Sequence, residues 1–313
     1  MELPESRQLK NAADQSVLRA GYDPRKLVAF HTAVMLVLSL AAMVIDFALE
    51  QKIGNTGGLS GVGMRAVLET VQTVLRQVQS IALPFWQVGW IYAAVKIAQG
   101  ETAGKKDLPE GFRRFPGFLR LTVLKGLILL GIVIAAAYVS SSVLMMTPLA
   151  NAMRELMTVD PESLTEAQQL MEQMMQILKP LMIVTAIVTL VLYVPFFYRF
   201  RMAEYCLLDE PQSGARAALR GSRELMRGNM WKLMRLDLSF WWFWLLTVLV
   251  SALGWADMLL PVAGIALPWS NTVSYFAAYL LAAAAQLALY YFCKARVDVT
   301  YAHAYLALQT DEK

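Results

Sequence analysis

The stretch from Arg199 to Trp241, RFRMAEYCLLDEPQSGARAALRGSRELMRGNMWKLMRLDLSFW, follows one apolar run of the chain and leads into the next. Small and apolar residues within it recur at the spacing of one helix face; they are Ala215, Ala218, Leu219, Ser222, Leu225 and Met226. A second set is basic and consists of Arg216, Arg220, Arg223 and Arg227. At about 100° per residue these arginines form a stripe roughly 60° wide beside the apolar face. The pattern predicts an amphipathic helix over residues 213–227.

A helix of this kind suits a bilayer surface, with apolar side chains toward the lipid and guanidinium groups reaching the headgroups. We therefore expect the four arginines to contact anionic lipid headgroups, or else a membrane or cytoplasmic protein partner. The alternative is that the helix only packs under the bundle and fixes its orientation. Asp209, Glu210, Pro211 and Ser213 supply a turn and an N-cap before the helix, and Gly228 with Asn229 supplies a left-handed stop after it.

The same stretch resembles a known family. The residues that carry the resemblance are Met202, Tyr205, Leu208, Asp209, Pro211, Ala215, Ala218, Leu219, Ser222, Leu225, Met226, Gly228, Lys232, Leu233, Leu238, Ser239 and Phe240. They are similar to the pattern of DUF975, a family of bacterial integral membrane proteins with no assigned activity. Where that family often has an Ile-Pro-Gly-Ile-like turn, this chain has Val194-Pro195-Phe196-Phe197. The resemblance implies several membrane helices in a bacterial inner membrane, and it implies neither a substrate nor an active site.

The composition also indicates a membrane protein. The chain is 57% apolar and 17% charged, whereas a soluble domain carries about 25% charged residues. The apolar residues lie in runs of about 20, the length that crosses a bilayer. We predict an all-α fold, a polytopic transmembrane helical bundle of about six spans with amphipathic surface helices. The predicted spans are residues 27–49, 81–98, 118–145, 181–200, 233–253 and 273–292.

The distribution of positive charge predicts the orientation of these spans. Of the 28 lysines and arginines, 23 lie in the segments assigned to the cytoplasmic side and at their borders, as the positive-inside rule requires. We predict a cytoplasmic segment over residues 1–26, a membrane domain over 27–300 and a cytoplasmic tail over 301–313. An amphipathic helix is expected outside the membrane, kinked by Pro84 into the second span; its apolar face consists of Val67, Val71, Val74, Leu75 and Val78.

Few residues suggest chemistry. No zinc-protease motif is present, and the two histidines, His31 and His303, lie at opposite ends of the chain. Asp46, Glu50 and His31 form the one set that a membrane enzyme could use, and we predict no catalytic residue and no cofactor. Cys206 and Cys293 lack metal-ligand spacing. Methionines cluster over residues 145–182, where packing is favoured over Cu(I) binding.

The positive charge does not indicate a nucleic-acid-binding protein, because no soluble domain remains to bind one. Residues 111–120, GFRRFPGFLR, interleave aromatic residues with arginines beside a span, which is typical of an interfacial anchor. We therefore expect a non-enzymatic integral membrane protein with a scaffold, assembly or envelope-associated role, whose basic surface helix faces the cytoplasm. The alternative is a transporter or export permease for an apolar or amphiphilic solute.

Overall fold

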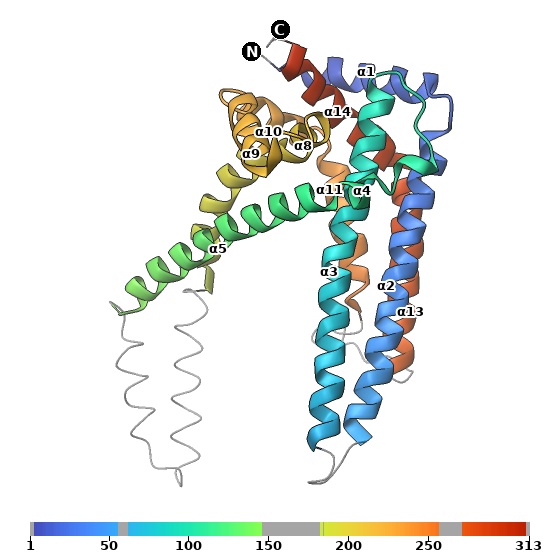
Figure 1. The fold of residues 1–313 in the computed structure, drawn as a ribbon, viewed down its shortest axis with the longest axis vertical. Coiled ribbons are helices and arrows are strands. Elements are labelled where there is room, and N and C mark those ends of the chain that lie inside the picture. Colours follow the sequence, from blue (N-terminus) through green and yellow to red (C-terminus); the bar gives the residue numbers. More distant parts are fainter. Residues whose placement is uncertain (1–2, 56–61, 146–181, 184, 257–270, 311–313) are drawn as a thin grey trace.

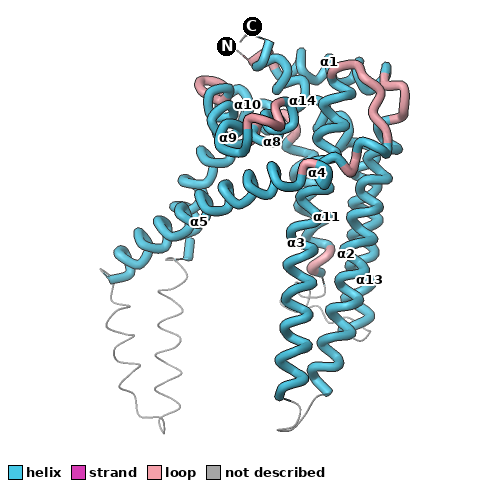
Figure 2. Tube along the Cα trace, in the orientation of Figure 1, coloured by secondary structure: helices cyan, strands magenta, loops and turns pink. Residues whose placement is uncertain are grey.

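The computed structural model describes residues 3–55, 62–145, 182–183, 185–256 and 271–310, and every regular element in these ranges is a helix (Figure 2). The elements are α1 (Ser6–Arg19), α2 (Pro24–Asn55), α3 (Val62–Ala98), η2 (Lys105–Asp107), α4 (Glu110–Arg113), α5 (Phe115–Met145), α8 (Ala203–Asp209), α9 (Gly214–Leu225), α10 (Met230–Leu238), α11 (Trp241–Leu253), α13 (Asn271–Leu289), a π-helical turn (Tyr290–Lys294) and α14 (Ala295–Thr310).

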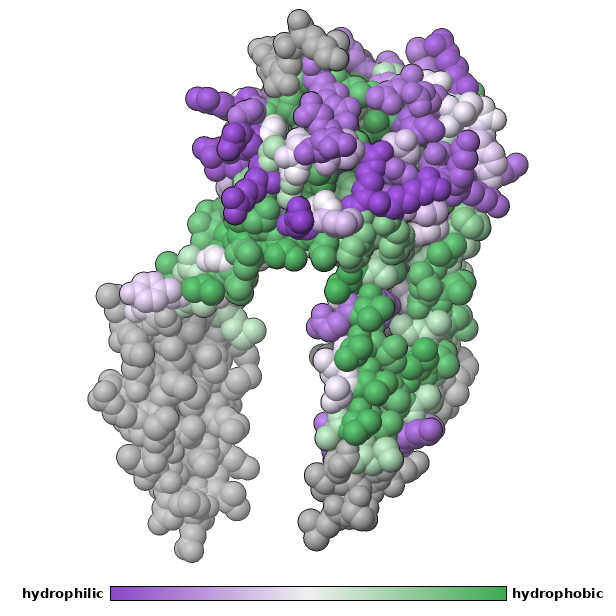
Figure 3. Space-filling view, in the orientation of Figure 1, coloured by the Kyte–Doolittle hydropathy of each residue, from purple (hydrophilic) through white to green (hydrophobic). Residues whose placement is uncertain are grey.

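The helices form two layers. A polar cap consists of α1, η2, α4, α8, α9, α10 and α14, and long helices descend from it (Figure 1). Figure 3 shows the same division, because hydrophilic residues gather over the cap and hydrophobic residues over the described lengths of the long helices. The first and last described helices, α1 and α14, pack against each other within the cap.

The long helices confirm the predicted fold class. Among the described residues, five helices are long and apolar enough to cross a membrane, and a bent pair brings the number to six. The five are Pro24–Ile53, Met64–Ala98, Phe115–Ser140, Thr185–Asp209 and Phe276–Gln309, and the bent pair is Met230–Leu238 with Trp241–Leu253. The chain is therefore a polytopic, all-α membrane protein.

The expected amphipathic helix and the second span form one continuous helix, α3, with Pro84 inside it. This helix packs along α2. Arg76 on α3 pairs with Asp46 (2.9 Å) and Glu50 (3.3 Å) on α2. These pairs join the N-terminal half of α3 to the C-terminal half of α2.

The fifth span differs from the expectation. The helix expected over residues 233–253 is divided into α10 and α11, which meet at an angle of 64°. At the break, the Ser239 hydroxyl donates to the Leu236 carbonyl (2.6 Å), and Lys10 Nζ donates to the Ser239 carbonyl (2.9 Å). Side chains therefore satisfy the backbone groups that the bend exposes. α10 belongs to the cap, and α11 continues from the bend and packs against α13.

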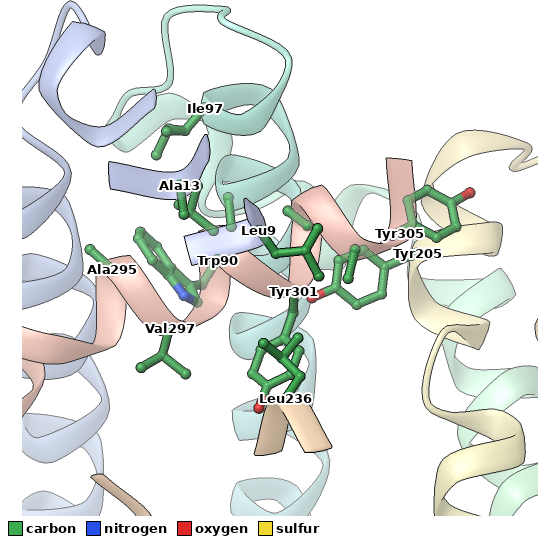
Figure 4. Close-up of a cluster of buried hydrophobic side chains, with 14 of the residues drawn as sticks. Leu9, Ala13, Trp90, Ile97, Tyr205, Leu236, Ala295, Val297, Tyr301 and Tyr305 are labelled. Carbon is green, nitrogen blue, oxygen red and sulfur yellow. The ribbon is translucent and has the colours of Figure 1, made fainter. Parts of the chain in front are cut away.

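The predicted tail after residue 300 is helical for most of its length, since α14 continues to Thr310. Tyr301, Tyr305 and Leu308 on this helix are buried. They pack in the core of the cap with Leu9 of α1 and Trp90 of α3 (Figure 4). The last span thus passes from the membrane through the π-helical turn into the centre of the cap.

Two glycines bring α3 and the α4 region into backbone contact. A Cβ at Gly89 would lie 1.6 Å from the Leu108 carbonyl oxygen, and one at Gly111 would lie 2.0 Å from the Phe85 carbonyl oxygen. No side chain fits at these separations. Glycine at both positions therefore allows α4 and the preceding turn to lie directly on α3.

Some expected features lie outside the described residues. These are most of the methionine-rich segment, the helix start predicted at Asp160-Pro161-Glu162 and the outer turn from Pro261 to Pro268.

Candidate functional site

The arginine stripe lies on α9, which begins at Gly214 and ends at Leu225. Arg216, Arg220, Arg223 and Arg227 are all exposed. Within the part of the chain that the structure describes, none of the four forms a hydrogen bond or an ion pair, although many other cap cations are paired. The stripe is therefore a set of unneutralised cations on one flank of a short helix.

The apolar face of α9 contacts protein. Ala215, Ala218 and Leu219 pack against Phe118 and Leu121 of α5, and α8 covers the same face. The helix is thus seated on the bundle, as the alternative interpretation proposed for this face, and the arginines occupy the flank that remains open. Its apolar residues are not available to enter a bilayer.

Because α9 packs on the beginning of α5, the arginine stripe lies near the border between the cap and the spans. Phe118 and Leu121 lie in the first two turns of α5, and exposed aliphatic side chains begin at Val123 and continue with Leu127. Lys125, in the same region of α5, pairs with Glu204 of α8 at 2.5 Å. The ion pair of Lys125 and the first exposed aliphatic residues therefore lie close together on α5, the helix that α9 packs against.

Several motif residues position α9 and its neighbours. The Ser222 hydroxyl donates to the Arg199 carbonyl (3.0 Å), and Met226 is fully buried. Gly228 has φ +83°, the left-handed conformation expected after a helix. The expected N-cap at Ser213 does not form, because its hydroxyl donates back to the Glu210 carbonyl (2.8 Å).

The remaining motif residues connect α8 and α10 to the other cap helices. Asp209 accepts a hydrogen bond from Gln309 of α14 (2.6 Å). Phe240 is buried, and the ammonium of Lys10 lies 4.2 Å from its ring centre. Pro211 is exposed in the turn before α9, and Lys232 lines a cavity beside α1. Most of the motif therefore serves the architecture of the cap.

Sequence reasoning missed a charged cluster around Asp237 of α10. Its carboxylate accepts hydrogen bonds from Arg201, from the Tyr301 hydroxyl and from the Tyr198 hydroxyl (2.7 Å for Tyr198). Arg201 also lies over the Tyr301 ring, 4.3 Å from its centre. Because an ionised carboxylate only accepts, it can satisfy all three donors at once. The cluster joins the fourth span, α10 and α14 at one point.

A second cluster fixes the last helix against α3. Asp298 accepts from the Trp90 indole (2.5 Å) and pairs with Lys294 (2.8 Å). Nearby, the His31 ring stacks on Trp86 with centroids 5.7 Å apart, and the Trp86 indole donates to the His31 carbonyl (3.1 Å). These contacts tie α2, α3 and α14 together.

The residues weighed for catalysis do not come together. Asp46 and Glu50 pair with Arg76, whereas His31 lies near the opposite end of α2, about 22 Å from Asp46 at 1.5 Å per helical residue. His303 contacts the Ser16 hydroxyl at 2.9 Å. Among the described residues, no group of three histidine, cysteine or acidic side chains could hold a metal ion. Cys206 and Cys293 do not form a disulfide with each other.

The electrostatics of the cap show where positive charge accumulates. Burial, followed by repulsion from Arg296, lowers the pKa of Lys10 from its ordinary value, and the nearby Asp14 offsets this in part. Arg296 is itself paired with Asp14 at 2.7 Å. Together, α1, α10 and α14 carry six lysines and arginines and three carboxylates.

Comparison with known proteins gives one family and no closer relative. The model of a family described as "Protein of unknown function (DUF975)" matches residues 19–292. No curated protein and no solved structure matches the sequence. The matched range includes the arginine stripe, Asp237 with its partners Tyr198 and Arg201, and all spans except the end of the last one. The chain is a member of the DUF975 family, whose function is unknown.

Proposed function

We propose that this protein is a non-enzymatic membrane scaffold whose cap engages anionic lipid headgroups through the arginine stripe of α9. The observation that carries the proposal is that the two faces of this helix have different surroundings. Ala218 and Leu219 are occupied by contacts with α5 and α8, while the four arginines are exposed and unpaired among the described residues. Guanidinium groups bind phosphate in a bidentate manner, and α9 rests where the apolar surface of α5 begins.

The polar clusters support a scaffold. Asp237, Asp298 and Glu204 each have cationic or hydroxyl partners within the cap. Charges in such pairs hold helices in a fixed arrangement and are satisfied without a substrate. The stripe, in contrast, has no partner among the described residues, which makes it the surface best suited to a ligand outside the chain.

We also propose that the cap faces the cytoplasm of a bacterial inner membrane. The cap helices carry 12 of the 28 lysines and arginines, and the positive-inside rule places such basic segments on the cytoplasmic side. Leu18 on α1 is 83% exposed and gives a test. A single cysteine at this position, with Cys206 and Cys293 replaced by serine, should resist an impermeant thiol reagent in intact cells and react after the membrane is broken. Labelling in intact cells would place the cap outside.

Lipid engagement is tested with the full-length protein in vesicles. Brominated lipids quench tryptophan fluorescence, so quenching by brominated phosphatidylglycerol relative to brominated phosphatidylcholine gives the preference for anionic lipid. Replacing all four arginines by glutamine should lower this preference by up to about 4 kcal/mol, at roughly 1 kcal/mol per charge near the surface. The matched Arg→Lys variant, which keeps the charge, should retain most of it. An unchanged preference in the glutamine variant would exclude the lipid proposal.

A further inference from the structure

A cavity of about 690 Å³ lies between the beginning of α1 and α10. It is lined by residues Leu3 to Gln8 on one side and by Lys232 and Arg235 on the other. Its volume falls in the range of about 300–1,000 Å³ that is typical of small-molecule sites. None of the four α9 arginines lines it, so it is distinct from the stripe.

The walls of the cavity are fixed by the core of the cap. Leu3 is buried, and its backbone N–H donates to the Asn229 side-chain oxygen (3.1 Å). The Asn229 amide nitrogen in turn donates to the Leu225 carbonyl (3.1 Å). Leu9, in the second turn of α1, packs in the same hydrophobic core as Leu233 of α10. The described part of the N-terminal segment is thus anchored to the beginning of α10, and the cavity lies between two anchored elements.

The lining is strongly cationic. Arg7, Lys232 and Arg235 contribute three positive charges, and Glu5 contributes one negative charge. Arg7 and Arg235 are exposed and form no hydrogen bond or ion pair with any described residue. One turn beyond Arg7, the lowered pKa of Lys10 reflects burial and the charge of Arg296. Among the described residues that line the cavity, positive charges therefore outnumber carboxylates.

The chemistry of the lining selects the class of ligand. The two guanidinium groups of Arg7 and Arg235, approaching from α1 and α10, match the oxygens of a phosphate group that carries two or more charges. The apolar side chains of Leu3 and Pro4 can cover a less polar part of the same molecule. We propose that this cavity is a binding site for a phosphate-bearing anion, which bridges the N-terminal segment and α10. The phosphate belongs either to a soluble phosphorylated molecule or to a lipid headgroup.

The test uses the full-length protein in nanodiscs of zwitterionic phosphatidylcholine, with inorganic pyrophosphate as the probe in isothermal titration calorimetry. Pyrophosphate should bind, and the double variant Arg7→Gln/Arg235→Gln should bind it at least tenfold more weakly. The control Lys26→Gln/Lys106→Gln removes two exposed charges elsewhere in the chain and should leave the affinity within about twofold of the native protein. A melting curve for each variant establishes that it is folded.

A second arm repeats the titration in nanodiscs that contain phosphatidylglycerol. Weaker pyrophosphate binding there would identify a lipid headgroup as the occupant, and equal binding would identify a soluble molecule; both results support a phosphate site. The proposal is overturned if pyrophosphate fails to bind in phosphatidylcholine nanodiscs, or if the two double variants lose affinity equally. The variant lacking the four α9 arginines should still bind pyrophosphate, so failure of this site and failure of the lipid proposal are distinguishable.

Discussion

The α3 and α5 helices both run from the cap into the membrane, yet they are packed in opposite ways. In the apolar 18-residue stretch of the span Met64–Ala98, 39% of the residues are buried inside the protein, compared with 6% in the corresponding stretch of Phe115–Ser140. α3 packs along α2 and carries Trp90 into the centre of the cap. α5 packs against α4, α8 and α9 through its first turns, and most of its remaining described length is exposed.

The difference shows where the fold is held together. Lipid tails are as apolar as leucine, so apolar surface alone does not drive helices together in a bilayer. α5 and the fourth span are connected to the rest of the protein through the cap, where Phe118 and Met202 lie in its buried cores. Lys125 with Glu204 (2.5 Å) and Arg114 with the Leu208 carbonyl (2.7 Å) join α5 to the end of the fourth span, and Arg201 with Asp237 joins the fourth span to α10. The cap therefore joins two differently packed groups of spans.

The largest effect is expected where α4 lies on α3. Replacing Gly111 by alanine puts a Cβ 2.0 Å from the Phe85 carbonyl oxygen, and overpacking of this kind costs about 3 kcal/mol or more because backbone must move. Gly126→Ala on α5 is the matched control, since nothing lies within 4 Å of its Cβ position; alanine's helix propensity should leave it neutral or up to about 1 kcal/mol more stable. Unfolding by SDS in mixed micelles measures both. Equal stabilities would contradict the contrast between α3 and α5.

The next effect concerns the cluster that connects the two groups of spans. Asp237→Asn leaves the Arg201 guanidinium without its anion, and both side chains are only 14% exposed. Removing one partner of a buried ion pair costs about 3–5 kcal/mol. The same unfolding measurement should detect this loss, together with faster proteolysis after the fourth span.

Asp46→Asn provides the comparison for Asp237. It breaks the pair with Arg76 at the far end of the α2–α3 hairpin, where the Arg76 side chain is 55% exposed. Such exposed pairs contribute only about 0–1 kcal/mol. If the two asparagine variants were equally stable, the cap would not be the connection between the spans.

The smallest effect is a pH dependence from Lys10. Its pKa is lowered in the folded protein from the ordinary 10.5, so the unfolded chain binds more protons between the folded value and 10.5. The contribution of Lys10 to stability should therefore rise as the pH rises through that window. The difference in melting temperature between the native protein and Lys10→Gln, followed from pH 8 to pH 10.5, isolates this group. A difference that is constant with pH would show that Lys10 does not titrate abnormally.

Local patterns in the sequence predicted the helices whose apolar residues recur at a regular spacing or form long runs. The face of α9 formed by Ala215, Ala218 and Leu219 follows from its spacing, and the apolar runs predicted the spans because bilayer thickness sets their length. The sequence could not predict whether that α9 face contacts protein or lipid, since a helix packed on either one shows the same apolar stripe.

Contacts between distant residues could not be predicted. The Asp237 cluster joins residues 36 and 64 positions apart in the chain, and neither distance leaves a local pattern. The bend between α10 and α11 contains neither proline nor glycine, and its carbonyl at Ser239 is satisfied by Lys10 from the other end of the sequence. α14 resembled a tail because its buried face contains tyrosines and alanines, which gave a weak apolar signal.

The level of α9 relative to the bilayer tests the central claim most directly. Single spin labels at position 220, at Leu18 and at Leu127, in a chain with both cysteines replaced, would be compared by EPR power saturation in bilayers containing phosphatidylglycerol. Leu18, 83% exposed in the cap, reports water, and Leu127, 59% exposed on α5, reports lipid. We predict that the label at 220 lies at the phosphate plane, between these two references. A label at 220 as accessible to a water-soluble relaxant as the label at 18 would remove the stripe from the membrane surface and contradict the proposed function.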